Sequence, residues 1–280
     1  MKKSLKFQFA TMLASRNFNI IMILSIALAI APGLFYGIKF HNADINTVPA
    51  AYSFYLGSDY TGIINRIYYV LMPLLAVIPF ADSYFTDCEN NTIYAVLSRC
   101  GKTQYYFGKL ICVFVSGIII TAVPLLINFI INLFIFPLNS TIEFLNGFGQ
   151  IQNQLYTAYP EDYFPIFFYR LFCTNQYLYE LAYLPIAAVF GGLLAAIAFQ
   201  ISFFFKGNKL LLNCILFIIV NLLSIVPASL PINLNLQDYL CAGRIGVNQS
   251  YLGFGILWLL CIACAVLPIP VNIKRLKNIL

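Results

Sequence analysis

The sequence predicts an all-α, polytopic membrane protein with six transmembrane helices and both termini in the cytoplasm. Three observations support this prediction. First, 61% of the residues are hydrophobic and only 9% are charged, whereas a soluble domain has about a quarter charged residues. Second, six apolar stretches are each long enough to supply the roughly 20 helical residues that cross a bilayer. Third, the basic residues are distributed unevenly among the segments that join these stretches.

The predicted spans lie near residues 18–38, 62–83, 108–137, 181–205, 210–230 and 251–273. In the second of these, Arg66 and Asp82 flank the uncharged run and are expected at opposite membrane surfaces. The link Lys206-Gly207-Asn208-Lys209 is so short that the fourth and fifth spans should form an antiparallel hairpin. Residues 1–280 are therefore expected to form a single membrane domain.

The segment before the first span predicts a helix at the membrane surface. Within residues 1–17, Leu5, Phe9 and Met12 recur at helical spacing among basic residues. The apolar run that follows continues past a plausible cleavage point, so a signal peptide is not expected.

The distribution of positive charge predicts which segments face the cytoplasm. With the N-terminus inside, the inner segments contain most of the 16 basic residues. These inner residues are Lys2, Lys3, Lys6, Arg16, Arg99, Lys102, Lys109, Lys206, Lys209, Lys274, Arg275 and Lys277. Only Lys39, Arg66, Arg170 and Arg244 lie outside. This arrangement satisfies the positive-inside rule and explains the formal charge of +6 without a nucleic-acid partner.

The inner segment between the second and third spans contains Gly101-Lys102-Thr103, which looks like the end of a nucleotide-binding loop. A phosphate-binding loop needs an earlier glycine, but Val96 occupies that position. The loop also needs a preceding strand, and the element before it is amphipathic with helical spacing. We therefore expect no ATP site, and no cofactor, on this chain.

The same segment predicts a short amphipathic helix. Asn90 and Asn91 suit a helix start, and Gly101 suits a helix end. Ile93, Val96 and Leu97 follow the spacing of one apolar face. Two interpretations remain open. The stripe packs on the protein's own bundle or on lipid headgroups, or it enters a groove on a cytoplasmic partner.

The wider pattern around this helix resembles the permeases of bacterial ABC transporters of the type-two exporter family. The resemblance rests on Asp82-Ser-Tyr-Phe85-Thr-Asp87-Cys-Glu89-Asn-Asn91-Thr92, then Leu97-Ser98-Arg99, Tyr105 and Lys109. The six-span layout agrees loosely along the whole chain. Two positions depart from the family pattern, since Asn91 stands where glycine is common and Cys100-Gly101 where proline is often found.

The resemblance implies a coupling helix within residues 87–101, in a coupling loop at 84–107, that docks on a separate ATP-binding cassette subunit. The residues implied in docking are Asp87, Glu89, Thr92, Ile93, Val96, Leu97 and Arg99. ATP and Mg would be bound by that partner, and a second permease subunit, identical or homologous, would complete the transporter in the bacterial cell membrane. The implied function is export, and the aromatic residues of the chain favour an amphiphilic peptide, lipid or drug as the cargo, including export of antimicrobial peptides or resistance to them. A non-transporting membrane sensor, or an immunity or assembly component that docks a cytoplasmic partner, is the alternative.

The chain lacks the residue patterns of an enzyme. His41 is its single histidine, and no Gly-x-Ser-x-Gly or His-Glu-x-x-His pattern occurs. We expect no catalytic site, no metal site and no carboxylate inside a span. Asn128, Asn132 and Gln200 are candidates for lining a substrate path, the alternative being hydrogen bonds between helices.

The outer segments are rich in aromatic residues and contain two cysteines. Residues 138–180 include Phe164, Phe167, Phe168 and Phe172, whose spacing predicts a helix lying on the outer surface. Its aromatic side chains either anchor the chain at the interface or shape a site for an amphiphile. Cys173 and Cys241 are both expected outside, where we hypothesise that they pair.

Overall fold

The computed structural model describes residues 2–57, 62–139, 167–204, 209–225, 235–242 and 250–277. All regular secondary structure in these residues is helical, which confirms the all-α prediction. The elements are α1 (Lys2–Ala14), α2 (Arg16–Lys39), η1 (Ile45–Thr47), η2 (Ala51–Phe54), α3 (Ile63–Val77), α4 (Ser83–Glu89), α5 (Thr92–Cys100), α6 (Lys102–Ile135), α8 (Tyr169–Thr174), α9 (Gln176–Ser202), α10 (Lys209–Ile225), α11 (Leu236–Leu240), α12 (Tyr251–Val266) and α13 (Ile269–Lys277).

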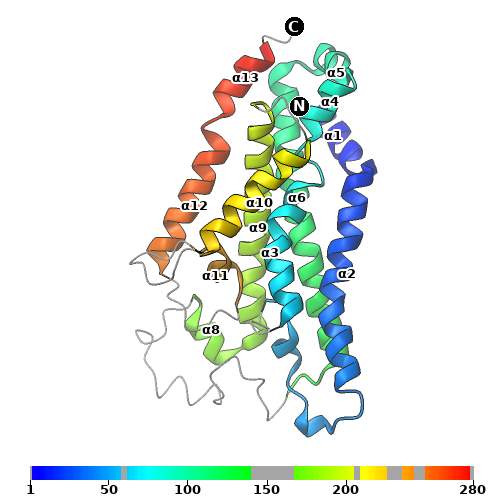
Figure 1. Cartoon of the computed structure of the whole chain (residues 1–280), viewed down its shortest axis with the longest axis vertical. Coiled ribbons are helices and arrows are strands. Elements are labelled where there is room, and N and C mark those ends of the chain that lie inside the picture. The colour runs from blue at the N-terminus through cyan, green and yellow to red at the C-terminus, as the bar shows by residue number, and fades with distance from the viewer. Residues whose placement is uncertain are drawn as a thin grey trace.

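The helices form an elongated bundle with α6 at its centre. Helices α2, α3, α6 and α9 run along the long axis, and α12 inclines away from them on one side (Figure 1). Helix α6 packs most extensively on α9 and α2, and it also contacts α1, α3, α5 and α13. Because α6 contacts all of these helices, its displacement would change the packing throughout the bundle.

Four helical segments are long and apolar enough to cross a membrane: Arg16–Lys39, Lys102–Ile135, Gln176–Ser202 and Tyr251–Leu276. The predicted second and fifth spans correspond to shorter helices. Helix α3 has 15 residues and α10 has 17, which correspond to about 22 and 25 Å of helix, whereas the hydrocarbon core is about 30 Å thick. The chain therefore has the character of a membrane protein, with four candidate spans and two shorter apolar helices among the described residues.

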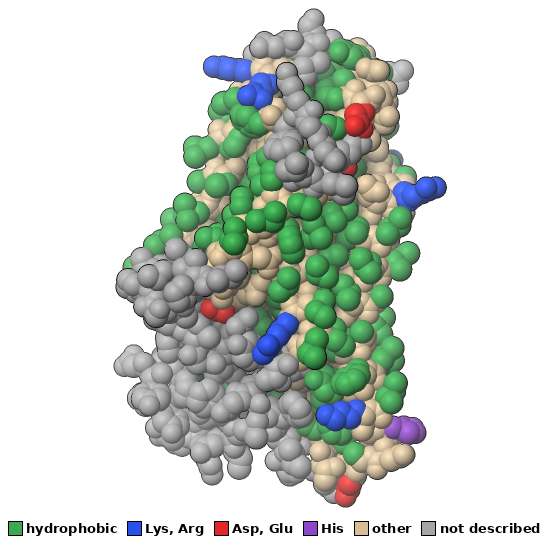
Figure 2. Space-filling model, in the orientation of Figure 1, with side chains coloured by type: hydrophobic (Ala, Val, Ile, Leu, Met, Phe, Trp, Pro, Cys, Tyr) green, Lys and Arg blue, Asp and Glu red, His purple; other side chains and the backbone are tan. Residues whose placement is uncertain are grey.

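The surface agrees with a membrane location. Hydrophobic side chains cover most of the described surface between the two ends of the bundle on the face seen in Figure 2. Many hydrophobic side chains of the described residues are large and well exposed, such as Ile23 at 69%, Phe134 at 87% and Leu259 at 68%. Exposure on this scale is costly in water and is expected where lipid tails replace the solvent.

Both ends of the described chain lie at the same end of the bundle as α4 and α5 (Figure 1). Helix α1 begins there and α13 finishes there, while η1, η2 and α8 lie at the opposite end. The sequence predicts this grouping, because an even number of crossings returns the chain to the side on which it starts.

Helices α6 and α9 cross closely at a point where glycines face each other. A Cβ atom on Gly117 would lie 2.5 Å from the carbonyl oxygen of Gly191, and one on Gly191 would lie 2.1 Å from the Oγ1 atom of Thr121. Neither distance is possible for a real side chain. Small residues thus let the two backbones meet directly, which is how helices associate where no water drives them together.

Candidate functional site at the α4–α5 hairpin

Helices α4 and α5 form a hairpin between α3 and α6, and two backbone positions define its shape. Asn91 joins α4 to α5 in the left-handed conformation, with φ at 55°. Asparagine is among the few non-glycine residues that tolerate this conformation. Gly101 ends α5 with φ at 73° and ψ at 153°, a region almost reserved for glycine. The structure thus places Gly101 at the helix end that the sequence predicts.

An ion pair fastens this hairpin to the central helix. The Oδ2 atom of Asp87 in α4 lies 2.6 Å from the Nζ atom of Lys109 in α6. Tyr105, one turn earlier on α6, donates its hydroxyl to the same carboxylate oxygen at 2.5 Å. Since residues four apart share one face of a helix, Tyr105 and Lys109 approach Asp87 together. Three residues that carry the family resemblance are therefore brought into contact.

Lys109 is held in an almost dry environment. Its side chain is 3% exposed, and that of Asp87 is 22% exposed. Its Nζ atom also donates to the carbonyl oxygen of Ser83 at 2.7 Å and lies 5.6 Å from the ring centre of Phe80. A buried ammonium group is costly unless it is paired and hydrogen-bonded, and here both conditions are met. The ion pair therefore specifies one position of the hairpin against α6.

Two neighbouring groups in α4 do not add charge to this pair. Burial raises the pKa of the Cys88 thiol and the pKa of the Tyr84 hydroxyl above their ordinary values. Both groups are consequently neutral at physiological pH. Asp87 remains the acceptor that Lys109 and Tyr105 share.

The apolar stripe of α5 faces the chain's own bundle. Ile93 is 1% exposed and Leu97 is 4% exposed, and Val96 is partly buried against the same core. Of the two interpretations of the stripe, the structure places Ile93 and Leu97 in contact with the protein's own core, because their side chains fill the space between α5 and the bundle. They are consequently not available on the outer face of the hairpin.

The outer face of α5 is formed by other residues. Tyr94 is 48% exposed, and Thr92, Ala95 and Ser98 are exposed as well. Glu89 at the end of α4 is exposed beside them. The side chain of Arg99 lies outside the described residues. Tyr94, Ala95 and Ser98 follow helical spacing, so they make one continuous surface, which we call the outer face of α5.

The candidate path residues Asn128 and Asn132 both lie inside the bundle, at the α2–α6 contact. The amide of Asn128 donates to the carbonyl oxygen of Ala29 at 2.7 Å, and its Oδ1 atom accepts from the backbone N–H of Leu56 at 2.8 Å. Asn132 donates to the carbonyl oxygen of Phe54 at 2.8 Å. These bonds join α6 to α2 and to the η2 region, as expected for amides that connect helices.

Gln200 occupies a similar position between α6, α9 and the C-terminal helices. Its Nε2 atom donates to the carbonyl oxygen of Ala265 at 2.6 Å. Its Oε1 atom accepts from the hydroxyl of Tyr106 at 2.5 Å and from the amide of Asn272 at 2.7 Å. All three candidates, Asn128, Asn132 and Gln200, are at most 1% exposed, and these contacts hold helices together.

A buried carboxylate occurs where the sequence predicts none. Glu180 is 2% exposed and lies within α9, near its outer end, because this helix begins at Gln176 rather than near residue 181. Asn175 provides the signal that could have revealed this start, since its side chain accepts from the N–H of Leu178 at 3.1 Å. The expectation that no carboxylate is buried in a span is therefore corrected at Glu180. Asp238 in α11 is also only 2% exposed.

The remaining expectations on the outer side fall partly outside the described residues. Most of segment 138–180, including Phe164, is not described, and α8 covers only Tyr169–Thr174. The side chain of Cys173 is not described either, while the thiol of Cys241 donates to the carbonyl oxygen of Gly57 at 2.7 Å. Within the described part of the chain, no group of three or more His, Cys, Asp and Glu residues could hold a metal ion.

Comparison with known proteins adds no relative. No protein-family model matches the chain, and neither a curated protein nor a solved structure matches it.

Proposed function

We propose that the chain is the membrane-spanning subunit of an ABC exporter and that the α4–α5 hairpin receives the movement of a separate ATP-binding cassette subunit. The observation that carries this proposal is the attachment of the hairpin to α6 through Asp87, Lys109 and Tyr105. A push on the hairpin is thereby transmitted to the helix that contacts most of the bundle.

The position of the hairpin supports a cytoplasmic partner. It lies at the end of the bundle that also contains both chain ends, and the positive-inside rule assigns that end to the cytoplasm (Figure 1). The outer face of α5 is the surface offered to the partner, with Glu89 and Thr92 at its edge. Val96, which is partly buried, borders that face rather than forming its centre.

In this proposal, ATP binding and substrate passage belong to different subunits. ATP and Mg are bound by the partner, and two membrane subunits, identical or homologous, enclose the path of the substrate. The substrate is an amphiphilic peptide, lipid or drug, in keeping with the aromatic residues of the outer segments. The location is the bacterial cell membrane.

The test is an Ala95→Arg substitution on the outer face of α5. Ala95 is exposed, so the larger cationic side chain leaves the fold intact and obstructs the partner surface. We expect loss of co-purification with the ATP-binding subunit and loss of the ATP turnover that the membrane subunit stimulates. Ala10→Arg is the matched control, because Ala10 is an exposed alanine of α1 at the same end of the bundle.

Normal association and turnover in the Ala95→Arg variant would contradict the docking surface. A complex that forms, hydrolyses ATP and moves no amphiphile in reconstituted vesicles would instead support the alternative, a sensor or an immunity or assembly component. The two results are separable because one measures binding and the other measures transport.

A further inference from the structure

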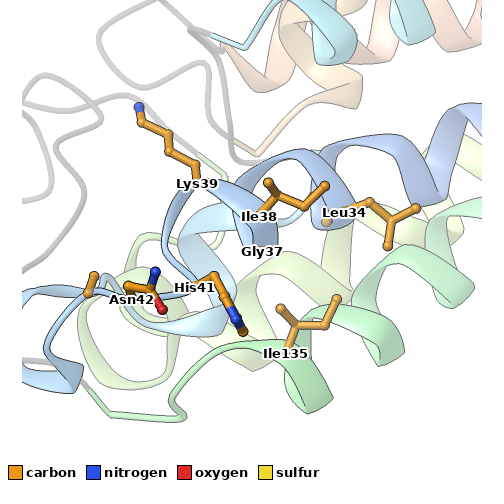
Figure 3. A pocket seen from close by; sticks show the side chains of 9 residues that line it. Leu34, Gly37, Ile38, Lys39, His41, Asn42 and Ile135 are labelled. Atoms are coloured by element: carbon orange, nitrogen blue, oxygen red, sulfur yellow. The ribbon is translucent and has the colours of Figure 1, made fainter.

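A groove lies at the end of the bundle away from the α4–α5 hairpin, between the last turns of α2 and the end of α6 (Figure 3). Its volume is about 780 Å³, which falls within the range of pockets that bind small molecules. Leu34, Ile38 and Ile135 line one part of it, and Lys39, His41 and Asn42 line the other.

Two glycines of α2 line the groove where this helix approaches α6. A Cβ atom on Gly33 would lie 2.9 Å from the Oδ1 atom of Asn132, and one on Gly37 would lie 3.2 Å from the Cγ2 atom of Ile135. A side chain at either position would require the facing side chain of α6 to shift. The glycines therefore allow close packing and, at the same time, leave this part of the groove without side chains.

The apolar part of the groove is exposed to whatever surrounds the bundle. Leu34, Ile38 and Ile135 are 55%, 79% and 40% exposed. They lie on the last turns of two helices that are long and apolar enough to cross a membrane. In a bilayer, these side chains are at the depth of the lipid tails, so the material that fills this part of the groove is hydrocarbon.

The polar part begins where the apolar helix ends. Lys39 is the last residue of α2, and His41 and Asn42 follow in the exposed turn. Figure 3 shows Lys39 extending outward from the helix end, while His41 turns toward the end of α6 that carries Ile135. The Nζ atom of Lys39 lies 6.0 Å and 5.7 Å from the ring centres of Tyr36 and Phe40, so the cation is close to two aromatic rings, a residue type typical of the membrane interface.

We propose that this groove binds a phospholipid of the outer leaflet and prefers an anionic headgroup. The acyl chain lies along Leu34, Ile38 and Ile135, and the phosphate lies at the polar end of the groove, which Lys39, His41 and Asn42 line. A soluble anion would leave the apolar part unfilled, and a purely apolar molecule would leave the polar part unused. A phospholipid has an apolar part and a polar part in the same order along the membrane normal. An ammonium group near the membrane surface favours anionic lipid over zwitterionic lipid by about fivefold.

The experiment measures quenching of a tryptophan placed in the groove by lipids with brominated tails. The full chain with Trp258→Phe, which removes its only native tryptophan, receives Leu34→Trp and is reconstituted in vesicles. We expect brominated phosphatidylglycerol to reach this position with about five times the relative affinity of brominated phosphatidylcholine. Phe35→Trp is the matched control, because Phe35 is 58% exposed on the same turn without lining the groove, and there the ratio should be near one.

A second substitution tests the headgroup contact. Lys39→Gln should lower the ratio at position 34 to near one, whereas Lys6→Gln, an equal loss of charge at the other end of the bundle, should leave it unchanged. Equal ratios at positions 34 and 35, or a ratio that Lys39→Gln does not change, would overturn the proposal. Quenching by neither lipid at position 34 would also overturn it, because protein would then cover the groove.

A measurement on chains without the added tryptophan guards against damage from that substitution. Native mass spectrometry of the full chain should show bound phosphatidylglycerol that persists through detergent exchange and is lost in the Lys39→Gln variant. Equal retention by both chains, or displacement of the lipid by inorganic phosphate alone, would contradict a site for a whole phospholipid.

Discussion

Lys109 and Asp87 form an ion pair between the central helix α6 and the hairpin helix α4, with Nζ and Oδ2 atoms 2.6 Å apart. The hydroxyl of Tyr105 and the bond from Lys109 to the carbonyl oxygen of Ser83 join the same two helices, so the ion pair is the charged part of a larger contact. With it, the movement of one element requires movement of the other. The relationship leads directly to the first prediction.

Asp87→Asn should destabilise the protein more than Lys109→Met. The asparagine variant leaves an ammonium group that is 3% exposed without its anion, at a cost of up to about 3 kcal/mol. In the methionine variant, Asp87 keeps the hydroxyl of Tyr105 and is 22% exposed to solvent, so its charge remains tolerable. Thermal unfolding in detergent measures both. The double variant should recover part of the loss, and additive losses would show that the two residues do not interact.

Gly117→Ala and Gly191→Ala should each disrupt the α6–α9 crossing. The added methyl group at either position would overlap atoms of the other helix, forcing a separation that costs about 1–3 kcal/mol. Gly255→Ala in α12 is the matched control, since a Cβ atom there has nothing within 4 Å. That control should be neutral or slightly stabilising, because alanine favours helix over glycine. Equal melting temperatures for all three variants would contradict the close crossing.

Asn128→Leu should lower stability without changing the response to substrate. The substitution removes the acceptor for the backbone N–H of Leu56, and a buried group left unbonded costs about 1–3 kcal/mol. Asn19→Leu, at an exposed position of α2, should have a smaller effect, because it removes only a solvent-exposed bond of 3.3 Å to the carbonyl oxygen of Leu13. If Asn128 instead lined the substrate path, its variant would keep normal stability and shift the substrate concentration that activates ATP turnover.

Matched cysteines at the two ends of the bundle should report its orientation. Ala95→Cys in α5 and Ala43→Cys beyond α2 are identical changes at exposed positions. On intact cells, a membrane-impermeant maleimide should add label to the Ala43→Cys chain and none to the Ala95→Cys chain, relative to the native protein. Labelling of position 95 from outside would invert the orientation and remove the basis for a cytoplasmic partner.

Composition and spacing determined much of this architecture. A chain with 61% hydrophobic and 9% charged residues cannot bury its apolar surface in water, so the class of protein followed directly. The end of α5 also followed, because glycine suits a helix terminus wherever the helix is placed. These properties depend only on residue types and their spacing, which can be read directly from the sequence.

Tertiary structure decided what each side chain faces. The spacing of Ile93, Val96 and Leu97 required one apolar face on α5 but could not say whether protein or partner covers it. The contact of Asp87 with Lys109, the burial of Glu180 and the shortness of α3 likewise depend on which helices meet and where each one ends. The physical reason is that the spacing of apolar residues identifies which face of a helix is apolar. The element that covers this face depends on packing between segments that are distant in the chain.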